Sequence, residues 1–172
     1  MIRLLYFLFL LGSALVLQST LVPLVVPTWL AGGVDLPLIP VIHFALTRGA
    51  TSGMLTGALA GYLQDAMTGG ALGINGVAKI IAGYTGGFLK EKLFVRGIGH
   101  RAVSVSGAVL MSVLSKYGVL ALFGQSRPFI ISPFLMWAFL GNALLVLLFH
   151  ALLSRFEAYS GIRQEEELSL GD

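Results

Sequence analysis

Residues 49–92 read GATSGMLTGALAGYLQDAMTGGALGINGVAKIIAGYTGGFLKEK, and this stretch decides the fold. In its first half, glycine recurs at every fourth position, at Gly49, Gly53, Gly57 and Gly61. Residues four apart share one face of an α-helix, so these glycines form a ridge without side chains where another helix can approach closely. The turn signal Thr68-Gly69-Gly70 separates this segment from a second one, which carries Gly83 and Gly87. We therefore predict two membrane helices joined by a tight hairpin.

The composition of the whole chain places it in a membrane. The 172 residues are 56% hydrophobic and 11% charged, and the mean hydropathy is +0.89. Such a chain has too little polar surface to cover a soluble domain. Its apolar segments are long and do not alternate with polar residues as barrel strands do. The predicted fold class is therefore an all-α integral membrane protein.

Six apolar segments predict a bundle of six transmembrane helices. They run approximately over 4–26, 36–46, 51–67, 72–89, 102–123 and 129–153. The second segment is short and contains Pro37 and Pro40, so we expect a thin or broken helix, or one that is lengthened by residues of the Gly32-Gly33 turn. We expect a single transmembrane domain over residues 1–154 and a polar cytoplasmic tail over 155–172.

Basic residues predict the orientation, because lysine and arginine near span ends favour the cytoplasmic side. With six spans, eight of them fall on one side: Arg3, Arg48, Lys90, Lys92, Arg96, Arg101, Arg155 and Arg163. Arg127 falls on the other. We therefore expect a multi-pass protein with both termini in the cytoplasm. If the second segment does not cross the membrane, this separation of charge is lost.

Polar side chains gather in the outer half of the predicted bundle. They are Gln18, His43, Gln64, Asp65, Asn75, Lys79 and Lys116. An ionised group at the centre of a membrane helix costs about 2.5–3.5 kcal/mol, so each charge needs a partner. We expect Asp65 to pair with Lys79 or Lys116. Two interpretations stay open for the cluster: a polar contact that locks helices together, or an outward-facing cavity or partner surface. The glycine ridge likewise either packs inside the bundle or faces a partner helix.

No sequence motif indicates catalysis. The zinc-helix pattern H-E-x-x-H, the G-x-S-G turn of intramembrane serine proteases and the P-loop are all absent from the sequence. Asp65 has no second carboxylate within its span with which to share acid and base roles. We predict no catalytic residue, no metal site, no cofactor and no nucleic-acid partner.

Several motifs resemble the MreD family of the bacterial rod-shape machinery. The first is the sequence 17–21, LQSTL, with Pro23 after it, and the second is Asp35. The third is a run of residues in the central segments: Gly53, Gly57, Gly61, Asp65, Gly69, Gly70, Leu72, Gly73, Gly83, Tyr84 and Gly87. The resemblance covers residues 4–153. Val34 stands where the family pattern has proline, and Lys79 and Lys116 are not part of that pattern.

The resemblance implies a non-enzymatic scaffold of the cell-wall elongation complex in the bacterial cytoplasmic (inner) membrane. Its implied partners are MreC, RodA, a class B penicillin-binding protein, MreB and membrane lipid, and a homodimer is compatible with the same features. The family's fold is similar to the substrate-binding subunit of energy-coupling-factor vitamin transporters, which supplies an alternative function. That alternative would require an A-x-x-x-A face on the first span, where Ala14 is followed four residues on by Gln18.

Overall fold

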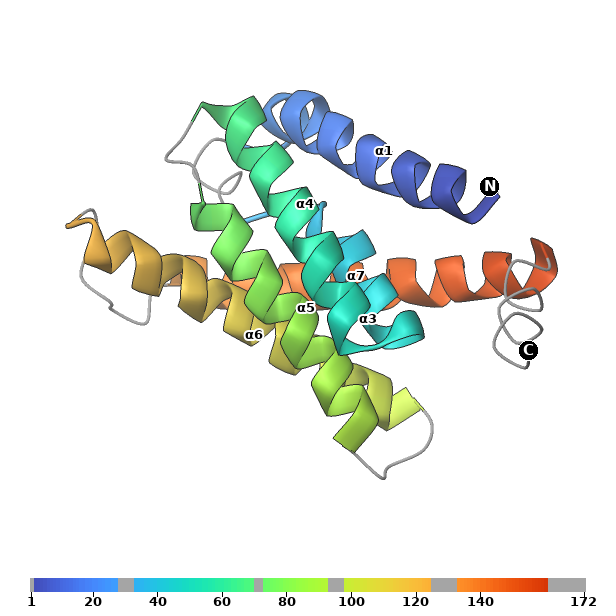
Figure 1. The fold of residues 1–172 in the computed structure, drawn as a ribbon. Helices are drawn as coiled ribbons and strands as arrows, with labels where there is room; N and C mark the ends of the chain where they lie inside the picture. Colours follow the sequence, from blue (N-terminus) through green and yellow to red (C-terminus); the bar gives the residue numbers. More distant parts are fainter. Residues whose placement is uncertain (1, 28–32, 70–72, 93–97, 125–132, 161–172) are drawn as a thin grey trace.

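The computed structural model describes residues 2–27, 33–69, 73–92, 98–124 and 133–160. These residues form helices only, and no strand occurs among them (Figure 1). The helices are α1 (Ile2–Val25), α3 (Leu38–Arg48), α4 (Ala50–Thr68), α5 (Ile74–Lys92), α6 (Ile98–Leu122) and α7 (Pro133–Ser160). The predicted all-α fold is thus confirmed.

Three of these helices are long and apolar enough to cross a membrane by themselves. Their apolar segments are Leu5–Val25 in α1, Gly99–Leu122 in α6 and Met136–Tyr159 in α7. Large hydrophobic side chains such as Phe9 and Leu24 are exposed on α1, as expected where lipid replaces water as the solvent. Helices α4 and α5 have 19 residues each and therefore a length of about 28 Å, close to the thickness of the hydrocarbon core.

Helix α3 covers the second predicted segment and is a short, continuous helix. Its 11 residues extend about 16 Å, roughly half of the hydrocarbon thickness. Residues 33–37 before it are not helical. Pro37 precedes the helix and Pro40 lies in its first turn, where a missing N–H group costs no intrahelical hydrogen bond. Every residue from Leu38 to Leu46 is buried, so α3 forms the centre of the bundle.

The core is built around α3. Ile42 of α3, Val105 and Val109 of α6 and Val146 of α7 belong to one cluster of fully buried side chains. A second cluster joins α1 to α3 and α4 through residues that include Leu11 and Leu15. These contacts leave α1 on the outside of the bundle, as Figure 1 shows.

The glycine ridge of α4 packs against α5. A Cβ atom added at Gly53, Gly57 or Gly61 would lie closer than 3.0 Å to backbone atoms of α5. The same holds in reverse for Gly83 against Gly53, and for Gly87 against the backbone of residues 49 and 50. The two helices therefore approach until their backbones touch. Of the two interpretations of the ridge, the structure shows packing within the chain.

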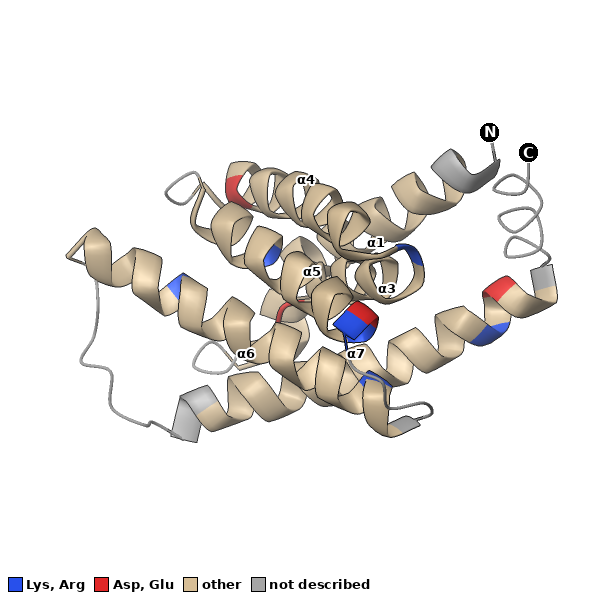
Figure 2. Ribbon diagram, turned by 60° about the horizontal axis from the view of Figure 1, so that its bottom comes forward, with Lys and Arg blue, Asp and Glu red and all other residues tan. Residues whose placement is uncertain are grey.

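Charged residues are few, and Figure 2 shows them both at helix ends and within α5 and α6. We call the end where α3 and α5 begin the Asp35 end, and the end where they finish at Arg48 and Lys92 the Arg48 end. Helix α1 begins and α7 finishes on one side of the molecule in both views. Helix α7 continues through Ser160, beyond the predicted domain boundary at residue 154. That boundary stays a prediction, and residues 161–172 lie outside the described part.

Candidate functional site

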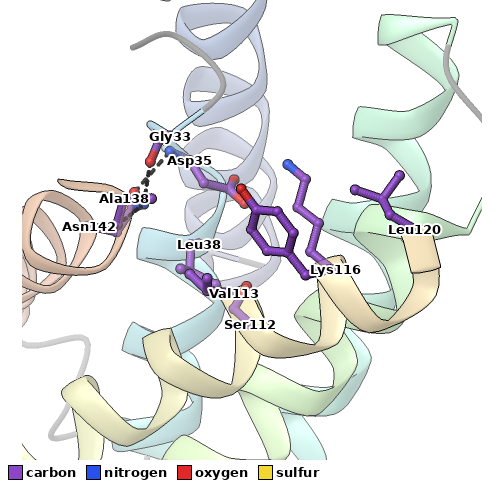
Figure 3. Close-up of a pocket in the computed structure, with 10 residues that line it drawn as sticks. Gly33, Asp35, Leu38, Ser112, Val113, Lys116, Leu120, Ala138 and Asn142 are labelled. Atoms are coloured by element: carbon purple, nitrogen blue, oxygen red, sulfur yellow. Dashed lines mark hydrogen bonds between the residues drawn. The ribbon is translucent and has the colours of Figure 1, made fainter. Parts of the chain in front are cut away.

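A cavity of about 290 Å³ lies at the Asp35 end (Figure 3). Its walls come from residues 33–38, α6 and α7. Asp35 and Lys116 extend into the same space from opposite walls, and Asn142 lies beside Gly33 at the α7 wall. Leu38, Val113 and Leu120 supply apolar surface. Of the predicted polar cluster, Lys116 is the one member that lines this cavity.

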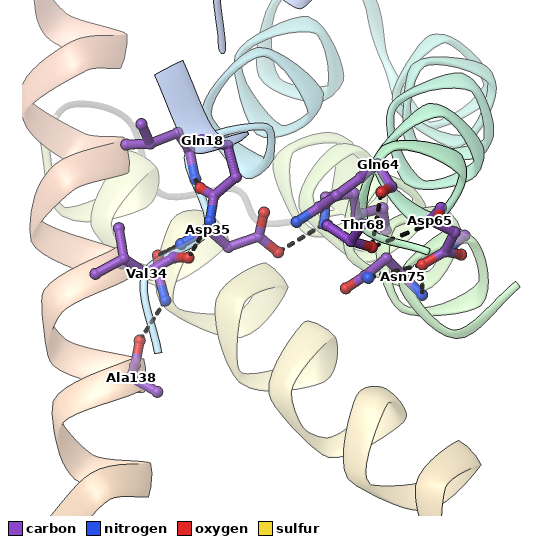
Figure 4. Close-up of polar contacts among 12 residues, drawn as sticks. Gln18, Val34, Asp35, Gln64, Asp65, Thr68, Asn75 and Ala138 are labelled. Carbon is purple, nitrogen blue, oxygen red and sulfur yellow. Dashed lines mark hydrogen bonds and ion pairs between the residues drawn. The ribbon is translucent and has the colours of Figure 1, made fainter. Parts of the chain in front are cut away.

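Gln18 of α1 holds the non-helical segment that forms one wall. Its Nε2 atom donates a hydrogen bond to the carbonyl of Val34 at 3.0 Å. The backbone N–H of Leu36 donates to Gln18 Oε1 at 2.8 Å (Figure 4). A carboxamide carries both a donor and an acceptor, so one side chain satisfies two backbone groups here. Gln18 therefore fixes the path of the chain into α3.

Asn142 of α7 holds the same segment from the other side. Its Oδ1 atom accepts a hydrogen bond from the backbone N–H of Asp35 at 2.9 Å. Its Nδ2 atom donates to the carbonyls of Gly33 and Ala138, both at 2.6 Å. Hydrogen bonds from α1 and α7 thus hold segment 33–37 between the two helices. They fix the position of the Asp35 backbone, from which its side chain extends.

Lys79 of α5 pairs with Asp35. The distance between Lys79 Nζ and Asp35 Oδ2 is 2.6 Å, and the lysine side chain is completely buried. The expected pairing of Asp65 with Lys79 or Lys116 is therefore wrong. Asp35 entered the sequence analysis only through the family resemblance, because it lies outside the predicted helix pair. A buried ion pair between residues 44 positions apart depends on tertiary packing, which periodicity does not reveal.

Asp65 instead caps the N-terminus of α5. Its Oδ2 atom accepts hydrogen bonds from the backbone N–H groups of Gly73, at 2.8 Å, and Gly76, at 3.3 Å. Its Oδ1 atom accepts from Asn75, through the side-chain Nδ2 at 2.7 Å and the backbone N–H at 3.3 Å. The first N–H groups of a helix have no intrahelical partner and favour a negative charge. These nearby donors satisfy the carboxylate without a lysine.

His43 lies away from this end of the bundle. It is the middle residue of α3, and its partners follow Asn142 along α7, toward the Arg48 end. Its Nδ1 atom is 3.1 Å from His150 Nδ1, and its Nε2 atom is 2.9 Å from Glu157 Oε1. The expectation that His43 belongs to the outer polar cluster is therefore wrong, because its ring contacts His150 and Glu157 of α7 instead of a member of that cluster.

Sequence reasoning missed the buried group formed by His43, His150 and Glu157. His150 and Glu157 are only 5% and 7% exposed, although the sequence assigns them no role. The signal available was their spacing, since seven residues return to the same face of a helix. Gln64 is also buried, and its Oε1 atom has no hydrogen-bond partner among the described residues.

The predicted polar cluster is thus divided among separate sites. Gln18 and Lys79 bind segment 33–37, Asp65 caps α5 and accepts a hydrogen bond from Asn75, and His43 joins α3 to α7. Within the described part of the chain, no group of three histidine, aspartate or glutamate side chains is arranged to hold a metal ion. Most of these contacts fasten one helix to another, as the interpretation as a polar contact that locks helices together predicts. The cavity at Lys116 agrees with the other interpretation, an outward-facing cavity or partner surface.

Comparison with known proteins yields one finding. The family model described as rod shape-determining protein MreD matches residues 1–156. No curated protein and no solved structure matches the chain. The expected likeness to transporter subunits therefore stays a prediction.

Proposed function

The chain belongs to the MreD family of rod shape-determining membrane proteins, and from this membership we propose that it is a scaffold of the cell-wall elongation complex that binds MreC. The family match over residues 1–156 carries the proposal, because it covers nearly all of the helical bundle. RodA, a class B penicillin-binding protein and MreB are the further members proposed for the complex.

The contacts inside the bundle support a scaffold. Asp35 and Lys79 neutralise each other, and Asp65 satisfies the first turn of α5. Backbone contact along the glycine ridge joins α4 rigidly to α5. These groups stabilise one arrangement of helices, as a protein that positions others requires.

Co-purification tests the proposal directly. We expect the tagged protein, extracted from its native membrane in mild detergent, to bring MreC with it, together with wall synthases identified by mass spectrometry. An equally abundant, tagged six-helix protein of another family is the matched control and should recover none of them. Recovery of paired ATPases with their membrane coupling subunit would contradict the scaffold and indicate the transporter alternative.

We also propose that the Arg48 end faces the cytoplasm of the cell, with both termini there. The support is the basic residues on helix ends at that side, among them Arg48, Lys90, Lys92 and Arg101. Arg96, Arg127 and Arg163, which contribute to the predicted charge separation, lie outside the described residues.

Single-cysteine labelling tests this orientation, since the natural chain has no cysteine. Phe123→Cys places a thiol at an exposed position at the Asp35 end, and Lys92→Cys places one at an exposed position at the Arg48 end. We expect a membrane-impermeant maleimide to label the first variant in intact cells and the second only after lysis. The reverse pattern would overturn the orientation.

A further inference from the structure

Lys116 is a cation without a counterion in the membrane-spanning part of α6. It lines the cavity at the Asp35 end, and it forms no hydrogen bond or ion pair with any residue that the structure describes. It also lies close enough to Lys79 for the two positive charges to repel each other. A charged side chain at membrane depth is costly when nothing neutralises it. Lys116 therefore requires an anion.

No acid of the described residues is available for this role. Asp35 is the one acid among them that lines the cavity, and Lys79 already neutralises it. Asp65 is held by the first N–H groups of α5 and does not line the cavity. Aspartate and glutamate are also absent from the segments that connect the helices there in the sequence, 28–32, 70–72 and 125–132. The cavity thus has one net positive charge, and its complement is an anion.

Ser112 places a hydrogen-bond donor beside this charge. It precedes Lys116 by four residues, so both side chains lie on the face of α6 that lines the cavity (Figure 3). The Ser112 hydroxyl has no hydrogen-bond partner among the described residues. An ammonium group and a hydroxyl group one helical turn apart can both donate to the oxygen atoms of one anion, and a phosphodiester presents such oxygens.

The depth of Lys116 fits the phosphate of a membrane lipid. Helix α6 has 25 residues and a length of about 37 Å. When α6 is centred in the membrane, each end extends about 4 Å beyond a hydrocarbon core of about 30 Å. Lys116 lies about 9 Å before the end of α6 at Leu122. Its backbone is then about 5 Å below the headgroup layer, a distance that an extended lysine side chain spans.

The remaining walls favour a lipid over a soluble anion. Leu38, Val113 and Leu120 give the cavity apolar surface, which an acyl chain covers and a small anion leaves exposed. The net positive charge favours a headgroup with one net negative charge, because a zwitterionic headgroup brings a second cation to Lys116. We propose that the cavity binds an acidic phospholipid such as phosphatidylglycerol, with its phosphodiester at Lys116 and Ser112. The proposal is independent of the scaffold function, since it needs no protein partner.

A competition between two lipids tests the selection by charge. Phosphatidylglycerol and phosphatidylcholine share the phosphodiester, but only phosphatidylcholine adds a cation. The purified protein is incubated with an equimolar mixture of the two, with identical acyl chains, and retained lipid is counted by native mass spectrometry. We expect one tightly retained lipid, with a preference for phosphatidylglycerol of about tenfold, because Lys116 and Lys79 repel the second cation. Equal retention of both lipids would overturn the proposal.

Charge variants separate the cavity from the rest of the protein surface. Lys116→Met is expected to reduce retention of phosphatidylglycerol about tenfold, whereas Lys116→Arg keeps the charge and should preserve it. Lys92→Met removes one cation at the exposed Arg48 end and should retain the lipid as the unmodified protein does. If Lys116→Met and Lys92→Met behave alike, the cavity is not the binding site. Melting temperatures measured beside the lipid counts show that each variant is folded.

Ser112→Ala tests the same site without changing any charge, and it serves if Lys116→Met does not fold. We expect retention of phosphatidylglycerol to fall about threefold, because the phosphodiester loses one hydrogen bond. Ser115→Ala is the matched control, since Ser115 donates to the carbonyl of Met111 and does not line the cavity. Equal retention by the two serine variants would mean that the headgroup does not lie at Ser112, and the proposal would fail.

A soluble phosphodiester is the other source of the same chemistry. Glycerophosphoglycerol carries the headgroup of phosphatidylglycerol without acyl chains, so it is titrated against the protein with its retained lipid. We expect no displacement of phosphatidylglycerol at equal concentrations. Displacement with equal potency would show that the ligand is soluble and would overturn the assignment to a lipid.

Discussion

Replacing Gly57 with leucine should destroy the packing of α4 on α5 and prevent accumulation of folded protein. A Cβ atom at this position already meets the backbone of Lys79 and Ile80 at distances that real side chains do not adopt. Backbone atoms cannot rotate away as a flexible side chain can, so the helices must separate along their length. Overpacking usually costs about 1–3 kcal/mol, and we expect at least the upper limit here. Thermal unfolding in detergent, followed by circular dichroism, measures the loss, and Gly57→Ala gives a milder form if the leucine variant does not fold.

Gly12→Leu is the matched control for this prediction. Gly12 lies within α1, and a Cβ atom there would meet nothing within 4 Å. The added side chain should point into lipid and change the stability by no more than about 0.5 kcal/mol. If the variants at positions 12 and 57 unfold at the same temperature, close contact between α4 and α5 does not hold the bundle together.

The helices were predictable from the sequence because their signals are local. Apolar length identified α1, α6 and α7, and a spacing of four residues marked the face on which α4 meets another helix. Pro37 and Pro40 marked the second segment as unusual, and α3 is a short helix of 11 residues there. The spacing could not decide whether the ridge meets α5 or another protein, since both surfaces require small residues.

The polar contacts were less predictable because they depend on depth and on distant partners. His43 and Glu157 are 114 positions apart, and their contact depends on the packing of α3 against α7. Asp65 offered a local signal, since it lies eight residues before Gly73, just across the hairpin. A carboxylate so close to the start of a helix is a candidate cap. The negative charge of Asp65 stabilises the N-terminus of α5 instead of pairing with a lysine, as we had expected.

Asp35→Asn should destabilise the protein by about 3–5 kcal/mol, the usual effect of removing one partner from a buried ion pair. Lys79 would then remain completely buried without its counterion. The double variant Asp35→Asn, Lys79→Met removes both charges and should be more stable than Asp35→Asn alone. Unfolding free energies of the two single variants and the double variant, measured in the same detergent, give the coupling energy between the two side chains.

The same cycle with Asp65 distinguishes the observed pair from the expected one. Asp65→Asn weakens the cap of α5 and has a cost of its own, but this cost should add to that of Lys79→Met within about 0.5 kcal/mol. Additivity with Asp65 and strong coupling with Asp35 would mean that the ion pair anchors segment 33–37 to α5. A larger coupling with Asp65 would contradict the Asp35 pair.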